Sequence, residues 1–281
     1  MNYYEGANIL SDNRAIGLFD SGIGGITVAK EIMKLLPRES IVYFGDTGRV
    51  PYGTKSSETI KKYALQDERF LLKNNVKLIV AACGTVSSVA YDTAKQLPVP
   101  FIEVVSHSVK AAVKATRNKK IGILATNATI KSGAHKKQIL SALPDAEVVE
   151  TAASLLVPIV EEGWTKKDNI VAREAVKTYL SPMIERGVDT VILGCTHFPV
   201  LQDMISEVLG KNVTLINMGT ATAHAVKDLL YSRGSLCCGD NIPKHRFYVS
   251  DETEAFAETA QKLIGCKLDK ELIEQVDIES E

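Results

Sequence analysis

Two stretches of the sequence decide the fold, VKLIVAACGT (76–85) and VDTVILGCTHFP (188–199), because each contains an apolar run of strand length that ends at a cysteine. A cysteine at the carboxyl end of a parallel strand points into the crevice where open α/β sheets bind ligands. Cys83 and Cys195 therefore indicate two related half-domains that present two thiols to one cleft. A symmetric pair of acid/base groups of this kind is what inverting a stereocentre without a cofactor requires.

The rest of the chain alternates short β-rich runs with longer amphipathic stretches, which is typical of parallel sheets in an α/β fold. We expect two similar three-layer α/β domains with mostly parallel sheets and the site in the cleft between them. The C-terminal segment could complete the first domain and make it discontinuous. Strands are expected at 15–20, 40–46, 76–83, 99–104, 120–126, 146–151, 188–195, 213–219 and 246–250. Helices are expected at 26–36, 57–74, 127–140, 168–186 and 220–233, and from Thr253 onward.

The composition excludes several classes of protein. With 281 residues, of which 45% are hydrophobic and 24% charged, the chain is typical of a globular protein with room for two domains. A net charge of -1 gives no reason to expect a nucleic-acid or membrane partner. No apolar run reaches the ~18 residues of a membrane span. The opening MNYYEGANILSDNR (1–14) lacks the basic-then-apolar pattern of a signal peptide, so we expect a cytoplasmic protein.

The five cysteines do not have the pattern of a disulfide framework, so Cys83 and Cys195 are expected to be free thiols. Cys237, Cys238 and Cys266 have no His or Cys at the spacing of zinc ligands, and we interpret them as structural or incidental. No metal site is therefore expected.

A glycine-rich turn, FDSGIGG (19–25), follows the first expected strand. Its glycine spacing fails the dinucleotide fingerprint, which leaves a tight βα turn whose backbone N–H groups could bind an anion. Asp20 places a carboxylate at the carboxyl end of that strand, where it could cap the helix or act in the site.

Polar residues also follow both thiols. Thr85 and Thr196 could supply hydroxyl and N–H donors for a carboxylate, and His197, beside a loop thiol, could relay a proton. In the loop GDTGRVPYG (45–53), turn chemistry explains most residues, but a Tyr-Gly pair could offer a backbone N–H and a wall. In PIVEEGW (158–164), Glu161 or Glu162 could reach the cleft or simply end a solvated helix.

Six ordered motifs resemble those of the glutamate racemases, a family within the cofactor-independent aspartate/glutamate racemase superfamily. They are IGLFDSGIGGITV (16–28), YFGDTGRVPYG (43–53), AACGT (81–85), LATNATIKSG (124–133), VPIVEEG (157–163) and LGCTHFPVL (193–201). The resemblance implies a discontinuous first domain (1–107 plus 217–281) with Cys83 and a second domain (108–216) with Cys195. It also implies cofactor-independent interconversion of L- and D-glutamate, supply of D-glutamate for peptidoglycan, and a homodimer.

The resemblance further assigns roles by position. Cys83 and Cys195 would be the two acid/base thiols, with Asp20 assisting the first and His197 the second. Glu161 matches a family carboxylate near the histidine. The substrate-binding residues would be Asp20, Ser21, Tyr52, Gly53, Gly84, Thr85, Thr126, Thr129, Thr196 and His197.

The chain departs from the family at Gly84, where the usual residue is an Asn whose side chain helps to hold the substrate. Glycine keeps the backbone N–H but removes the amide, and losing one hydrogen bond to a charged group costs about 1.5–3 kcal/mol. Two alternatives follow: a related racemase acting on aspartate, a hydantoin or a maleate-like diacid, or a weakened homologue that only binds an amino acid. The intact thiol pair favours an enzyme.

Overall fold

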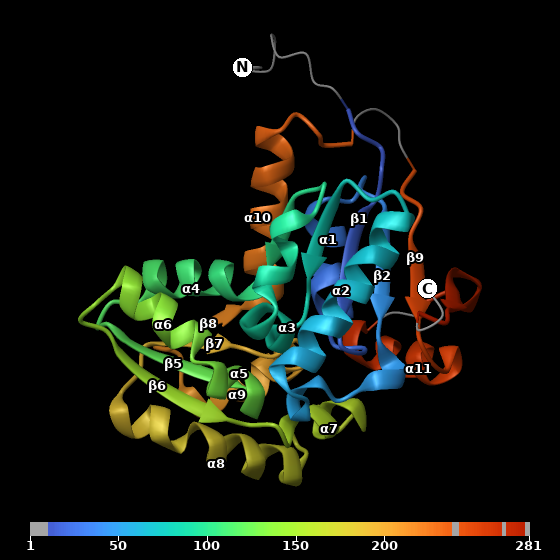
Figure 1. Ribbon diagram of the computed structural model, residues 1–281. Coiled ribbons are helices and arrows are strands. Elements are labelled where there is room, and N and C mark those ends of the chain that lie inside the picture. The colour runs from blue at the N-terminus through green and yellow to red at the C-terminus, as the bar shows by residue number, and fades with distance from the viewer. Residues whose placement is uncertain (1–10, 238–241, 266–267, 279–281) are drawn as a thin grey trace, which may run out of the picture.

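The computed structural model describes residues 11–237, 242–265 and 268–278. Within this part of the chain the strands form two wholly parallel sheets, one of six strands in the order β10-β9-β2-β1-β3-β4 and one of four in the order β6-β5-β7-β8 (Figure 1). The first sheet contains β1 (Ile16–Asp20), β2 (Ile41–Gly45), β3 (Leu78–Ala81), β4 (Phe101–Glu103), β9 (Arg246–Val249) and β10 (Ile273–Gln275). The second contains β5 (Lys120–Ala125), β6 (Glu147–Ala152), β7 (Thr190–Leu193) and β8 (Thr214–Asn217). The predicted α/β fold with mostly parallel sheets is confirmed.

Both sheets repeat one strand order, since β2-β1-β3-β4 of the first corresponds to β6-β5-β7-β8 of the second. In each sheet the strand that comes first in the sequence lies between the second and the third. The chain therefore adds one neighbour on one side of this strand and the next neighbour on its other side. Open α/β sheets bind ligands at the carboxyl ends of strands around such a switch point. The loops after β1 and β3 therefore correspond to the loops after β5 and β7.

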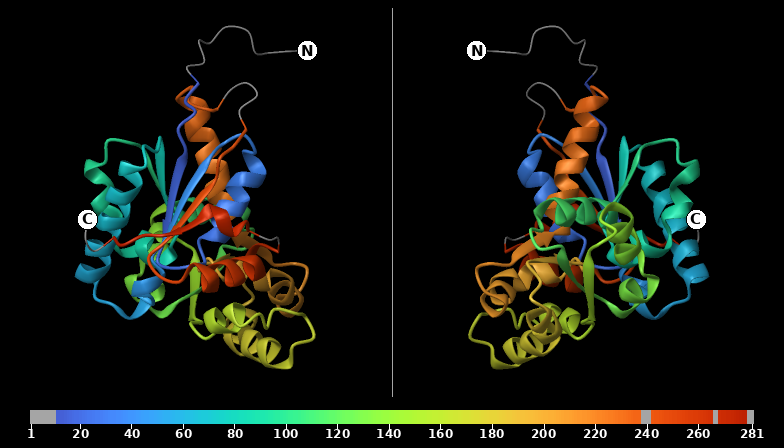
Figure 2. Two further views of the ribbon diagram at one scale, coloured as in Figure 1. Left: turned by 90° about the vertical axis from the view of Figure 1, so that its right-hand side faces the viewer. Right: turned by 90° about the vertical axis from the view of Figure 1, so that its left-hand side faces the viewer.

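Helices cover both faces of the sheets, as Figure 2 shows for the first sheet. Alternate residues of β1 enter different cores: Leu18 packs in the cluster that includes Ile32 of α1, and Phe19 in the cluster that includes Leu71 of α2. Successive strand residues point to opposite faces, and a sheet that is covered by helices on both faces is apolar throughout.

The helices are α1 (Ile26–Leu35), α2 (Ser57–Lys73), α3 (Gly84–Val89), α4 (Val104–Ala115), α5 (Asn127–Ser132), α6 (Ala134–Ala142), α7 (Leu156–Glu161), α8 (Ile170–Arg186), α9 (Gln202–Leu209), α10 (Met218–Ser232) and α11 (Thr253–Ile264). Short 3₁₀ helices are η1 (Thr47–Arg49), η2 (Tyr52–Thr54), η3 (Tyr91–Gln96), η4 (Phe198–Leu201) and η5 (Lys270–Leu272).

Two helices connect the sheets. α4 leads from β4 to β5, α10 leads from β8 back to β9, and the two helices pack against each other (Figure 1). The C-terminal segment then extends the first sheet, because β9 pairs with β2. The predicted domain boundaries at 107/108 and 216/217 fall in α4 and at the end of β8, and we retain the division as a proposal.

Some expected elements differ from the structure. The single helix expected at 127–140 is wrong, because it is divided into α5 and α6 at Gly133, whose φ of 64° lies in the left-handed region. A glycine adopts that conformation without the Cβ clash that other residues would have, so it ends one helix and begins the next. No helix in the described ranges is both long and apolar enough to cross a membrane.

Candidate active site

Both thiols lie where the sequence places them, just beyond the carboxyl ends of equivalent strands. Cys83 follows β3 and precedes α3, and Cys195 follows β7. The residues that contain them are 5% and 8% exposed, so protein atoms cover both sulfur atoms almost completely. Neither forms a disulfide. Of the remaining cysteines, Cys237 donates through its sulfur to Oδ1 of Asn13 at 3.0 Å, while Cys238 and Cys266 lie outside the described residues.

The two thiol loops meet backbone to backbone. A Cβ atom placed on Gly84 would lie 2.8 Å from the carbonyl oxygen of Gly194, the residue before Cys195. Real Cβ atoms do not approach a backbone oxygen so closely, so any side chain at position 84 would push the loops apart. Gly84 thus lies at a point of close backbone approach between the two thiol loops.

Two further contacts join the two halves of the molecule at the thiol loops. The hydroxyl of Thr27, in α1, donates to the carbonyl of Thr196 at 2.8 Å. The hydroxyls of Thr85 and Thr126 lie 3.5 Å apart, and Thr126 is also 3.1 Å from the hydroxyl of Thr129. Four of the predicted threonine residues are therefore at the junction of the two sheets. Thr27 was not among the predicted site residues, although it lies in the motif IGLFDSGIGGITV.

Cys83 has an anionic surrounding. Its thiol donates to the hydroxyl of Ser21 at 3.3 Å, and Asp20, the last residue of β1 and only 2% exposed, directly precedes Ser21. Burial, followed by the negative charge of Asp20, raises the pKa of the Cys83 thiol to about 12. Burial also raises the pKa of Asp20, against hydrogen bonds from the N–H groups of Gly25 and Gly22. Cys83 is consequently a protonated thiol next to a carboxyl group that is unusually ready to accept a proton.

Cys195 has a cationic surrounding. Its sulfur lies 3.8 Å from Nδ1 of His197, and Nε2 of that ring is 2.8 Å from Oε1 of Glu161, the last residue of α7. Burial alone would lower the pKa of His197, but the contacts with Cys195 and Glu161 outweigh it and raise this pKa to about 10. The ring is therefore an imidazolium at neutral pH, and its positive charge lies beside the Cys195 sulfur. The sequence had left open whether Glu161 or Glu162 reaches the site, and Glu161 makes this contact.

Tyr52 is a predicted substrate-binding residue, but its side chain is buried and bonds to a residue outside the thiol loops. The Tyr52 side chain is 1% exposed, and its hydroxyl donates to the carboxylate of Asp46 rather than to a thiol loop. Gly53 lies at the other side of the junction, since a Cβ placed on it would be 4.0 Å from Ala128 of α5. If this loop contacts a substrate, its backbone is the part available to do so.

Sequence reasoning missed the buried ion cluster behind this loop. Asp46 and Asp67 are each fully buried, and both bond to Arg49. The motif GDTGRVPYG contains an acidic and a basic residue three positions apart, but nothing in its pattern places them inside the protein. The partner carboxylate comes from α2, so only the tertiary structure brings the cluster together.

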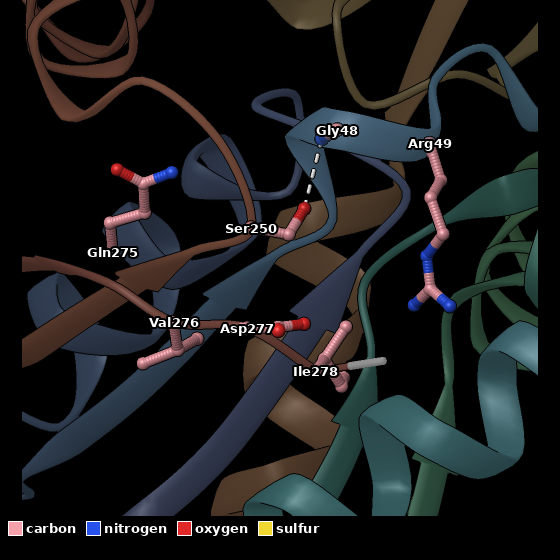
Figure 3. A pocket seen from close by; sticks show the side chains of 7 residues that line it. All are labelled: Gly48, Arg49, Ser250, Gln275, Val276, Asp277 and Ile278. Carbon is pink, nitrogen blue, oxygen red and sulfur yellow. Dashed lines mark hydrogen bonds between the residues drawn. The ribbon is translucent and has the colours of Figure 1, made fainter. Parts of the chain in front are cut away.

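Two hollows on the protein are lined by residues other than the two thiols. One, of about 550 Å³, is lined by Gly48 and Arg49, by Ser250 just after β9, and by the segment 275–278 (Figure 3). No cluster of three or more His, Cys, Asp or Glu side chains in the described ranges is arranged to hold a metal ion.

The sequence that builds this site matches a known protein family. The model of the Asp/Glu/hydantoin racemase family matches residues 26–226. The chain belongs to this family. Over 95% of this chain and 98% of the relative, it is 43% identical to a glutamate racemase of Geobacter metallireducens. A crystal structure of a glutamate racemase from Bacillus anthracis superposes with a TM-score of 0.88 at 34% identity, covering 95% of this chain and 98% of that one. A glutamate racemase from Francisella tularensis in complex with D-glutamate superposes with a TM-score of 0.87 at 36% identity, covering 96% and 100%.

Proposed function

We propose that the protein is a glutamate racemase that moves the α-proton with Cys83 and Cys195. The observation that carries the proposal is the pair of buried thiols, each just beyond an equivalent strand of two repeated sheets and each beside its own titratable partner. The relatives named glutamate racemase, one of them in complex with D-glutamate, support glutamate as the substrate. Their similarity spans nearly the full length of the chain.

In this mechanism the thiol environments define the starting state. Cys195, beside the His197 imidazolium, removes the α-proton from one face of the amino acid. Cys83, a protonated thiol, delivers a proton to the other face, and one C–H bond forms as the other breaks. After the turnover Cys195 is a thiol and Cys83 a thiolate. The starting state returns when Cys195 releases its proton to solvent and Cys83 takes one up from solvent, with Asp20 as a relay, and the cysteines exchange roles in the reverse direction.

The α-proton of an amino acid is only weakly acidic, so the site must stabilise the carbanion. Hydroxyl groups of Thr85, Thr126 and Thr196, with backbone N–H groups of the thiol loops, could donate to the α-carboxylate as charge moves onto it. Ser21, Thr129 and the Gly53 backbone would complete the binding site. Because the thiols are covered, the substrate must enter while the two sheets are further apart, and their closure excludes water.

The wider role is part of the same proposal. The named relatives are bacterial enzymes, which supports supply of D-glutamate for peptidoglycan synthesis in the cytoplasm. A homodimer is proposed from the family resemblance. The reaction as written needs no cofactor, because both protons come from side chains and solvent.

The test is circular dichroism of L-glutamate and of D-glutamate incubated with the purified protein, with aspartate run in parallel. Loss of signal from both enantiomers of glutamate, to the same racemic end point, is the expected result. Decay with aspartate but not with glutamate would move the assignment to another member of the family. No change with either amino acid would contradict a racemase of this substrate class.

A further inference from the structure

The cluster behind the Tyr52–Gly53 loop is built around one guanidinium. Nε of Arg49 bonds to Oδ2 of Asp46 at 2.6 Å, and one terminal nitrogen bonds to Oδ1 of Asp67 at 3.1 Å. The other terminal nitrogen donates to the Gln66 side chain at 2.6 Å. The planar group also stacks on Tyr63, with 4.1 Å from its carbon to the ring centroid. Arginine is suited to such a position because its fork bonds two carboxylates at once and its plane stacks on aromatic rings.

The same cluster includes the Tyr52 side chain. Its hydroxyl donates to Asp46 and lies 3.4 Å from Oδ2 of Asp67, and its ring packs 5.3 Å from that of Tyr63. Without the arginine, two buried carboxylates would face each other in a low-dielectric surrounding, where like charges repel strongly. Burial and the negative charge of Asp46 both raise the pKa of Asp67. Arg49 is the cation that lets this group of side chains stay assembled.

The loop is fastened on its outer side as well. The N–H of Gly48 donates to the Ser250 hydroxyl at 2.9 Å (Figure 3). The Ser250 hydroxyl in turn donates to Oδ1 of Asp46 at 2.8 Å. The N–H of Asp251 donates to the Thr47 hydroxyl at 3.0 Å. These bonds hold the start of the loop to the end of β9, and the arginine cluster holds the rest of it to α2.

Beyond the cluster, the loop reaches the second sheet. η2, which contains Tyr52 and Gly53, contacts α5, the helix that contains Thr129. The loop therefore extends from the fastened cluster to the junction where the predicted substrate-binding residues of both halves meet. A shift of its anchor would shift the backbone at Gly53.

We propose that Arg49 is a positioning residue: by bonding Asp46 and Asp67 at once, it holds the backbone of the Tyr52–Gly53 loop in place for the amino-acid substrate. Arg49 acts through the loop and does not itself contact the reacting atoms. This inference rests on the proposed racemisation for its kinetic consequence. Its structural consequence, an ordered loop, does not depend on which amino acid is used.

The experiment compares Arg49→Met and Arg49→Lys with a matched control, Lys77→Met. Lys77 also pairs with a buried carboxylate, that of Glu39, at 2.6 Å, and both side chains are almost fully covered. It lies just before β3, however, at the opposite end of that strand from Cys83. Hydrogen exchange of the peptide that covers 46–56 is measured by mass spectrometry, followed by kcat and KM for L- and D-glutamate. Each variant's Tm shows how much general stability it has lost.

For Arg49→Met we expect faster exchange at the loop and a KM for both enantiomers raised by about tenfold or more, with a smaller change in kcat. Arg49→Lys keeps the charge but not the fork, so an intermediate KM is expected, and this variant serves if Arg49→Met does not fold. Lys77→Met should lower Tm while leaving loop exchange and KM unchanged. Loop exchange and KM equal to those of the control would overturn the inference. If the wild-type protein does not racemise glutamate while Arg49→Met still frees the loop, the proposed function fails and the positioning role stands.

Discussion

The two halves of the molecule have the same strand order but opposite electrostatics around their thiols. After β3, Cys83 lies with Asp20, and its pKa is raised to about 12. After β7, Cys195 lies against an imidazolium that Glu161 helps to keep protonated. One scaffold used twice has therefore placed one buried thiol beside a carboxyl group and the other beside an imidazolium, and we propose that they act as acid and base. A reaction that removes a proton from one face and adds one to the other needs this inequality in each turnover.

Removing either thiol should have the largest effect, because each half supplies a group that the other cannot replace. Cys83→Ala and Cys195→Ala should each lower kcat for glutamate by at least about a thousandfold. Circular dichroism of both enantiomers measures this, and Cys237→Ala, a cysteine substitution outside the two thiol loops, is a control expected to keep wild-type activity. Substantial turnover by either thiol variant would show that one cysteine suffices.

Replacing the partner groups should be next in size. Asp20→Asn removes the carboxyl group that can relay a proton to Cys83, and His197→Gln removes the cation beside Cys195, so each should reduce kcat by about a hundredfold. Steady-state rates with L- and D-glutamate measure both variants. If either group could be replaced without any loss of rate, its effect on the neighbouring thiol would have no part in the reaction.

Gly84 tests the contact between the halves. A Cβ there would lie 2.8 Å from the backbone oxygen of Gly194, so Gly84→Ala should part the thiol loops and lower kcat/KM by roughly tenfold. Gly84→Asn carries the same Cβ and adds an amide, and we expect it to be no better than Gly84→Ala. An Asn variant more active than wild type would show instead that the loops adjust easily and that the missing amide limits the enzyme.

The smallest effect expected is a change in pH dependence. Because the pKa of His197 is raised from 6.5 to about 10, the stabilisation from its charge is complete below 6.5 and disappears as the pH rises through about 10. Glu161→Gln removes one cause of that rise, so the alkaline limb of kcat/KM should move to lower pH by about one unit. Glu162→Gln, at the neighbouring position, should leave the pH profile unchanged. Identical profiles for the two variants would exclude the ion pair from the mechanism.

The sequence predicted the parts of this architecture that local pattern encodes. Apolar runs ending in Cys83 and Cys195 were enough to predict thiols at strand ends in parallel sheets. A strand that is buried on both faces has apolar residues at nearly every position, and this makes it visible in the sequence. The division at Gly133 was missed, because a glycine within a helical pattern does not show whether its φ will be positive. The Arg49 cluster could not be predicted either, because its carboxylates come from a loop and a helix that only the fold brings together.

The central claim is that two different groups act on the two faces of the substrate. It is tested most directly by starting the reaction with L-glutamate in deuterated water and measuring deuterium at Cα of both enantiomers early in the conversion. With Cys195 and Cys83 on opposite faces, the D-glutamate formed should carry deuterium while the remaining L-glutamate does not, and the reverse should hold from D-glutamate. Product that retains the original hydrogen, or deuterium entering recovered substrate as fast as product, would show that one group serves both faces and would contradict the account.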